Sequence, residues 1–187
     1  KDNLLQYKSY GGTAITGTLI EDVWGGQTYG KTDPANGDTV RTPSLIKWTK
    51  KTDGSMEFDY TYFDKFVEVA KSAGVGNDIV MHSPMPWNNR VMFYDESQGG
   101  KLVSQIVNPA NKQQYSAFWK PFFEDFRDHL DEKGWFDDIS FGFDERPNMK
   151  TSFDVIDEVT NKDGHLFKKQ GAYNHIYNGD GVPDRMV

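Results

Sequence analysis

Strand-like and helix-like segments alternate along this chain, and this alternation limits its possible folds more than any other feature. Apolar and β-branched residues predict four strands, at residues 13–20, 79–83, 139–143 and 166–172. Apolar spacings of three and four, together with start and stop residues, predict four helices, at residues 2–9, 61–73, 115–133 and 151–160. Strands that alternate with helices favour parallel βα units.

The length of the chain bears on how many such units it can hold. A complete (β/α) barrel of the TIM type takes about 250 residues, and this chain has 187, beginning at a lysine. We therefore expect an α/β fold made of the central βα units of an incomplete TIM-type barrel. It would be a single domain over residues 1–187, truncated at both ends. Residues 21–56 and 87–109 are expected to be long loops, with a short strand near 45–49.

Composition excludes several classes of function. The formal charge of −7 argues against nucleic acid or an anionic membrane as a partner. The absence of cysteine excludes disulfides, thiol catalysis and cysteine metal sites. We find no membrane-spanning apolar run, no glycine-rich phosphate motif and no metal-ligand spacing, so we expect no cofactor, no metal and no membrane insertion. The sequence does not define an oligomeric state.

The segment Ile139–Pro147 contains the strongest candidate for a catalytic site. Its first five residues alternate large and small, as in a pleated strand, and Asp144 and Glu145 follow directly. The alternation places Ser140, Gly142 and Asp144 on one side, toward the barrel interior, and the large residues on the other, toward the helices. The carboxyl ends of such strands are where catalytic groups gather. The alternative is a structural turn in which the acids pair with Arg146, which is the commoner role for a generic strand-end Asp–Glu pair.

Other predicted strand ends carry polar and aromatic side chains suited to the same edge. His82 lies in the second strand and His175 follows the last one. Tryptophan and tyrosine in loops can stack on sugar rings, and residues of this kind in turn-rich stretches include Trp24, Trp87 and Tyr94.

Adjacent carboxylates favour a particular mechanism of glycoside hydrolysis. Two acids that flank a glycosidic bond lie about 5 to 9.5 Å apart, and neighbours at one strand tip cannot easily do so. They can act from one side, with Glu145 protonating the leaving oxygen while Asp144 holds a 2-acetamido group that attacks. Glu145 would then need a raised pKa to be protonated near neutral pH.

The chain resembles glycoside hydrolase family 123, a group of β-N-acetylgalactosaminidase-like enzymes. The likeness extends in order along most of the chain, through segments 22–29, 46–49, 58–64, 86–87, 130–135, 143–147 and 171–175. The resemblance implies a (β/α)-barrel catalytic domain and retaining, substrate-assisted hydrolysis, with Asp144 orienting the acetamido group and Glu145 as general acid/base. It also implies sugar contacts, which together with the strand-end histidines give the predicted substrate-binding set Trp24, His82, Trp87, Tyr94, Asn174 and His175.

Two functions therefore remain as hypotheses. The first is a glycosidase that removes terminal β-linked N-acetylgalactosamine from glycans or glycolipids, outside the cell or at its surface. The second is a non-catalytic carbohydrate-binding domain on the same scaffold. In both cases the expected partner is a carbohydrate.

Overall fold

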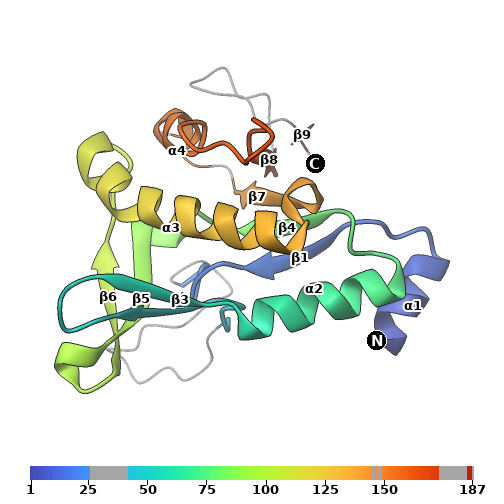
Figure 1. The fold of residues 1–187 in the computed structure, drawn as a ribbon, viewed down its shortest axis with the longest axis horizontal. Coiled ribbons are helices and arrows are strands. Elements are labelled where there is room, and N and C mark those ends of the chain that lie inside the picture. The colour runs from blue at the N-terminus through green and yellow to red at the C-terminus, as the bar shows by residue number, and fades with distance from the viewer. Residues whose placement is uncertain (26–41, 145, 147–148, 173–184, 187) are drawn as a thin grey trace.

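The main sheet of the protein is parallel and follows the chain order. The computed structural model describes residues 1–25, 42–144, 146, 149–172 and 185–186. Parallel pairing joins the five strands in the order β1-β4-β7-β8-β9 (Figure 1). Their bounds are β1 Ile15–Thr18, β4 Ile79–His82, β7 Ile139–Phe143, β8 Lys168–Gly171 and β9 Arg185–Met186. The four predicted strands are confirmed, and the two-residue β9 was not predicted.

Four α-helices occur in the described residues, and all four were predicted. They are α1 Asp2–Ser9, α2 Thr61–Ala73, α3 Lys112–Lys133 and α4 Met149–Ile156. Helix α3 begins three residues before its first predicted residue because Asn111 caps it, its Oδ1 accepting from the Gln114 amide at 3.1 Å. None of the described helices has the length and apolar character needed to span a membrane.

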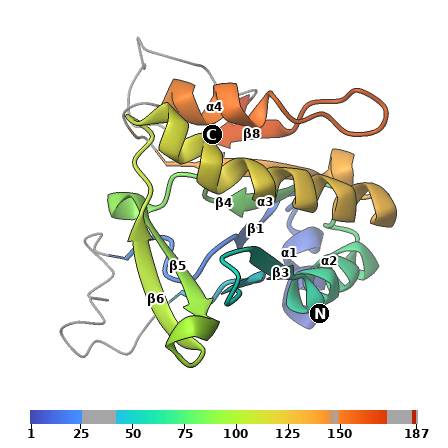
Figure 2. The same cartoon turned by 60° about the vertical axis from the view of Figure 1, so that its left-hand side comes forward.

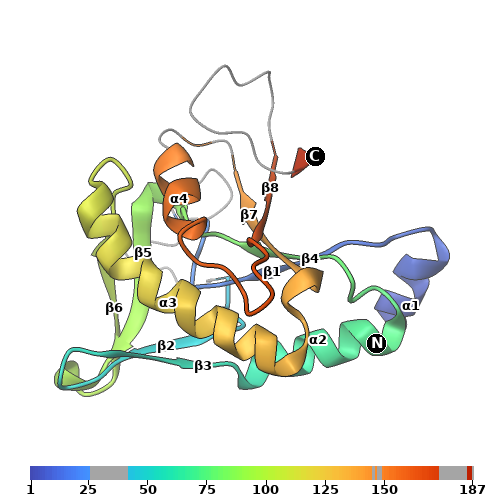
Figure 3. The ribbon, with the colours of Figure 1, turned by 45° about the horizontal axis from the view of Figure 1, so that its top comes forward.

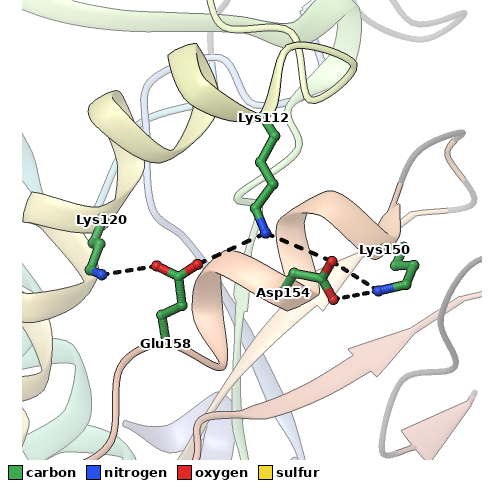
Figure 4. Close-up of polar contacts among 5 residues, drawn as sticks. All are labelled: Lys112, Lys120, Lys150, Asp154 and Glu158. Atoms are coloured by element: carbon green, nitrogen blue, oxygen red, sulfur yellow. Dashed lines mark hydrogen bonds and ion pairs between the residues drawn. The ribbon is translucent and has the colours of Figure 1, made fainter.

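The crossover helices lie together on one face of the main sheet (Figure 2). The Phe63 ring of α2 meets the Phe126 ring of α3 at 5.2 Å. Between α3 and α4, lysines and carboxylates form a chain of exposed ion pairs (Figure 4) that includes Lys120 with Glu158 at 2.9 Å and Lys112 with Asp154 at 4.0 Å. Such exposed pairs contribute little stability, so the aromatic contacts are the main support of this layer.

The segments predicted to be long loops contribute most of a second sheet, so the prediction of loops was wrong there, whereas the short strand expected near residues 45–49 is confirmed. Strands β2 (Lys47–Lys50), β3 (Met56–Asp59), β5 (Arg90–Asp95) and β6 (Lys101–Ile106) pair in the order β3-β2-β5-β6 (Figure 3). Strands β5 and β6 form an antiparallel hairpin whose turn contains Gly99 and Gly100, both at φ +72°. The two connections pair through β2 and β5, and a pairing between segments so far apart in the sequence leaves no local pattern.

The two faces of β7 have the neighbours that the alternation of large and small residues predicts. Phe141 packs on the Phe123 ring of α3 at 5.2 Å, and Phe143 packs on Phe153 of α4 at 4.9 Å. On the opposite side, Ser140 Oγ accepts a hydrogen bond from the Gln170 side chain at 2.8 Å. The described residues thus form an α/β fold with an open parallel sheet, and they do not close into a barrel.

Candidate functional site

Three connections meet at the carboxyl end of the main sheet. They follow β1, β4 and β7, which are neighbours, and backbone hydrogen bonds join the first two. The Leu19 amide donates to the His82 carbonyl at 2.5 Å, and the Trp87 amide donates to the Val23 carbonyl at 2.8 Å. This edge therefore has a fixed backbone on which side chains from distant parts of the sequence come together.

Asp144, Trp24 and His82 form the centre of this cluster. The Trp24 indole N–H donates to Asp144 Oδ2 at 2.9 Å. The Trp24 and His82 rings lie 5.6 Å apart at an interplanar angle of 45°. The Asp144 side chain thus accepts from an aromatic donor and lies near an imidazole, directly after the last residue of β7.

The imidazole of His82 is packed against Gly142. The two residues are register partners on β4 and β7, and a Cβ on Gly142 would lie 2.5 Å from Cδ2 and Nε2 of the ring. Only glycine leaves room for the ring in this position. Burial lowers the pKa of His82 below its ordinary value, and the Asp144 carboxylate opposes this effect. His82 Nδ1 is buried and has no hydrogen-bond partner among the described residues.

Arg146 connects the end of β7 to the connection that follows β4. Its guanidinium carbon lies 4.6 Å from the centre of the Trp87 ring, and one guanidinium nitrogen donates to Asn89 Oδ1 at 3.3 Å. Burial lowers the pKa of Arg146, while the charge of Asp144 raises it. Arg146 therefore covers part of a ring that we expected to face a sugar.

An ion pair between two connections supports this edge. Asp22 is 4% exposed and accepts from Arg90 at 3.1 Å, which joins the connection after β1 to the start of β5. Asp22, Asn88 and Asn89 all have φ between 54° and 59°, a region in which Asp and Asn are favoured over bulkier residues. In the sequence, Asp22, Asn88, Asn89 and Arg90 follow predicted strands and are therefore candidates for this edge, but the ion pair between Asp22 and Arg90 was not predicted.

The structure brings together three of the predicted site residues, Trp24, His82 and Asp144, and places Trp87 beside them through Arg146. Tyr94 lies elsewhere, on β5 with Lys47 Nζ 5.3 Å from its ring centre. It is four residues beyond Arg90, roughly 13 Å along an extended strand. Glu145, Asn174 and His175 lie outside the described residues. Within the described part of the chain, no three acidic or histidine side chains gather as a metal site.

The fold and this cluster define an α/β domain with a polar site at the carboxyl ends of its parallel strands. Comparison with known proteins identifies it further. The profile for "Glycoside hydrolase 123, catalytic domain" matches residues 1–187. The chain therefore belongs to glycoside hydrolase family 123, which confirms the resemblance seen in the sequence.

One solved structure shows how the chain relates to a longer protein. A family 123 glycoside hydrolase from Clostridium perfringens, studied for the details of glycolipid glycan hydrolysis, has a TM-score of 0.80 and 31% sequence identity to this chain. The match covers 92% of this chain and 29% of that one, so the chain spans less than a third of the solved protein. A search of the curated proteins found no match.

Proposed function

We propose that this chain carries the catalytic centre of a retaining glycosidase that removes terminal β-linked N-acetylgalactosamine from glycans or glycolipids. The observation that carries the proposal is the position of Asp144, at the carboxyl end of β7 with one oxygen held by Trp24 at 2.9 Å. Family membership and the glycolipid-directed relative from Clostridium perfringens support the substrate class. As part of this proposal, the enzyme acts outside the cell or at its surface.

The proposed reaction is substrate-assisted. The acetamido carbonyl oxygen attacks the anomeric carbon while Glu145 donates its proton to the leaving oxygen and the glycosidic bond breaks. Asp144 accepts a hydrogen bond from the amide N–H and stabilises the positive charge of the cyclic intermediate. Water then opens that intermediate, with Glu145 taking back a proton. Trp24, His82, Trp87, Asn174 and His175 are proposed to surround the sugar.

The proposed architecture is a TIM-type barrel to which this chain contributes central βα units. The strands of the main sheet follow one another in chain order, and the crossover helices lie on one face. Doubly wound sheets instead reverse their strand order and carry helices on both faces. The singly wound arrangement is the one that barrels use.

The first test is release of p-nitrophenol from p-nitrophenyl β-N-acetylgalactosaminide by a protein that contains this chain. We expect Asp144→Asn and Glu145→Gln each to lower the rate by about 10²-fold or more. The loss for Glu145→Gln should be larger with an alkyl aglycone, because an alkoxide needs protonation more than p-nitrophenolate does. The matched controls are Asp95→Asn and Glu96→Gln, since this second Asp–Glu pair lies outside the cluster, with Glu96 paired to Lys51.

The second test addresses the role of the acetamido group. Fluorine atoms on the acetyl methyl make the carbonyl oxygen a poorer nucleophile, so the rate should fall with each fluorine added. A rate that does not respond to fluorination would contradict substrate assistance. Sugar binding without turnover, insensitive to Asp144→Asn, would instead favour the non-catalytic binding domain.

A further inference from the structure

Trp24 was expected to stack on a sugar, and in the structure its polar group is already engaged by the protein. The indole has a single hydrogen-bond donor, and that donor is committed to Asp144 Oδ2 at 2.9 Å. The ring is half-buried, packs against the core and lies 5.6 Å from the His82 ring. These contacts hold the ring and its N–H in one direction, toward the tip of β7.

The hydrogen bond distinguishes the two oxygens of Asp144. Oδ2 accepts from Trp24, whereas Oδ1 accepts no hydrogen bond from the described residues. A carboxylate held at one oxygen has lost much of its freedom to rotate, and the other oxygen is then presented in a defined direction. Such preorganisation matters because a misplacement of about 1 Å in a reacting group can cost about 10²-fold in rate.

The other groups near Asp144 do not provide this direction. His82 and Arg146 both interact with it electrostatically, and Glu145 is its neighbour in sequence. Burial favours the neutral form of His82. Arg146 supplies a positive charge, but its guanidinium is held over Trp87 and donates to Asn89. Among the described groups, Trp24 is therefore the one that fixes the orientation of the carboxylate.

The turn that carries Trp24 is itself well anchored. The Asp22 amide donates to the Thr42 carbonyl and the Gly25 amide donates to the Asp22 carbonyl, both at 2.8 Å. The Val23 carbonyl accepts from Trp87, and the Asp22 side chain accepts from Arg90. Because the turn is already held in place, the Trp24 N–H can hold the Asp144 carboxylate without a large loss of conformational entropy when the substrate binds.

We propose that Trp24 is a positioning residue, which acts through Asp144 by holding Oδ2 so that Oδ1 is presented to the substrate amide. This inference rests on the function proposed above. It predicts that Trp24 contributes mainly to the catalytic step, whereas a sugar-stacking residue would contribute mainly to substrate binding.

The kinetic test compares Trp24→Phe with Trp48→Phe. Phenylalanine keeps an aromatic ring but has no N–H. For Trp24→Phe we expect kcat to fall by about 10- to 100-fold, with KM changed by less than about threefold. Trp48→Phe is the matched control, because its indole also donates one buried hydrogen bond, to the Leu19 carbonyl at 2.8 Å. It should lower stability and leave kcat close to the wild-type value.

A second measurement needs no enzymatic activity. Five tryptophans give five indole N–H resonances in a ¹⁵N-labelled sample of the 187-residue chain. In Asp144→Asn the acceptor becomes a neutral amide, so the resonance of one indole should shift strongly. In Trp24→Phe the indole resonance of Trp24 is absent, which assigns the resonance that shifts in Asp144→Asn. Trp24→Tyr gives the same assignment if Trp24→Phe does not fold.

The outcomes separate the two proposals. If Asp144→Asn lowers the rate but Trp24→Phe leaves kcat unchanged or raises KM alone, Trp24 is not a positioning residue and the proposed function stands. If Asp144→Asn moves no indole resonance, the contact is absent in solution and the inference is again overturned. If Asp144→Asn keeps the wild-type rate, the proposed function fails, and the inference fails with it.

Discussion

His82 combines burial, close packing and an unpartnered ring nitrogen at the base of the site. Its ring fills the space above Gly142, and Nδ1 has no acceptor among the described residues. A protonated imidazole there would carry a buried charge, and the Asp144 carboxylate offsets only part of that cost. The residue is therefore suited to work as a neutral ring.

This state of His82 predicts a dependence of stability on pH. Its pKa is lowered in the folded protein from an ordinary value of 6.5, so the unfolded chain binds the proton more readily. The stabilisation is present above pH 6.5 and is lost as the pH falls toward the lower folded-state pKa. Urea unfolding between pH 7.5 and 5 should show this loss, and His82→Gln should reduce the slope. The control is His165→Gln, where the side chain is half-exposed, and it should keep the wild-type dependence of stability on pH. If the wild type and both variants show the same pH dependence, His82 does not cause it.

Helix α3 connects the site to the helix layer through one buried hydroxyl. Tyr115 is fully buried, and its O–H donates to the Pro84 carbonyl at 3.0 Å. The same oxygen lies 2.5 Å from Ser152 Oγ on α4, and because the tyrosine proton is already used, the serine donates. The hydroxyl thus joins α3, α4 and the connection that follows β4.

Removal of that hydroxyl should be costly. In Tyr115→Phe the Pro84 carbonyl and Ser152 lose their shared partner in a buried place, so we expect the free energy of unfolding to fall by about 1–3 kcal/mol. Tyr62→Phe on α2, where the ring is 70% exposed, should change it by no more than about 0.5 kcal/mol. Chemical denaturation of both variants checks the difference, and similar values for the two would contradict the role given to Tyr115.

Most helices and strands could be predicted from local patterns, but the residues that cap the helices were harder to predict. The apolar face of α3 is evident in the sequence, whereas Asn111 acts through one side-chain oxygen and leaves no periodic signal. At the start of α2, Thr61 and Asp64 have the spacing of a capping box, with Asp in place of the usual Glu or Gln. The structure shows instead that Asp59 accepts from the Thr61 amide at 2.9 Å, while Asp64 pairs with His129 at 2.6 Å on α3. The capping box therefore does not form, because Asp64 pairs with a residue of another helix instead.

At the scale of the whole molecule, the second sheet supports the edge of the main sheet that carries the candidate site. It forms from the connections after β1 and β4, which pair through Thr49 and Tyr94. The Asp22–Arg90 ion pair joins this sheet to the turn that carries Trp24, and their side chains are 3% and 18% exposed. The long connections are therefore part of the framework that holds the site.

The ion pair can be tested with a substitution that keeps its shape. Asp22→Asn preserves size and tolerates φ +57°, but it leaves Arg90 with a neutral acceptor. We expect the free energy of unfolding to fall by about 1.5–3 kcal/mol, the range for a hydrogen bond to a charged group. The control is Asp128→Asn, because that carboxylate is 71% exposed in its pair with Arg127 and exposed pairs contribute little. A smaller effect for Asp22 than for Asp128 would contradict the supporting role.

The candidate site was predictable in part. The position of Asp144 at the end of a strand and the inward direction of Gly142 follow from alternation alone. The hydrogen bond between Trp24 and Asp144 could not be predicted, because it joins residues 120 positions apart through a turn whose geometry depends on the second sheet. The composition shows that the chain has several tryptophans. It does not show which of them can stack on a sugar and which donate a hydrogen bond to another side chain of the protein.

The contact between Gly142 and His82 also limits how this site can change during evolution or engineering. A side chain at position 142 would push into the imidazole, so the floor of the site cannot be made shallower one residue at a time. Variation that adapts such an enzyme to a different sugar must therefore occur in the surrounding connections, away from the residues that anchor them. Libraries aimed at new specificity should spare β7, Trp24 and the Asp22–Arg90 ion pair, and sample other positions in these connections.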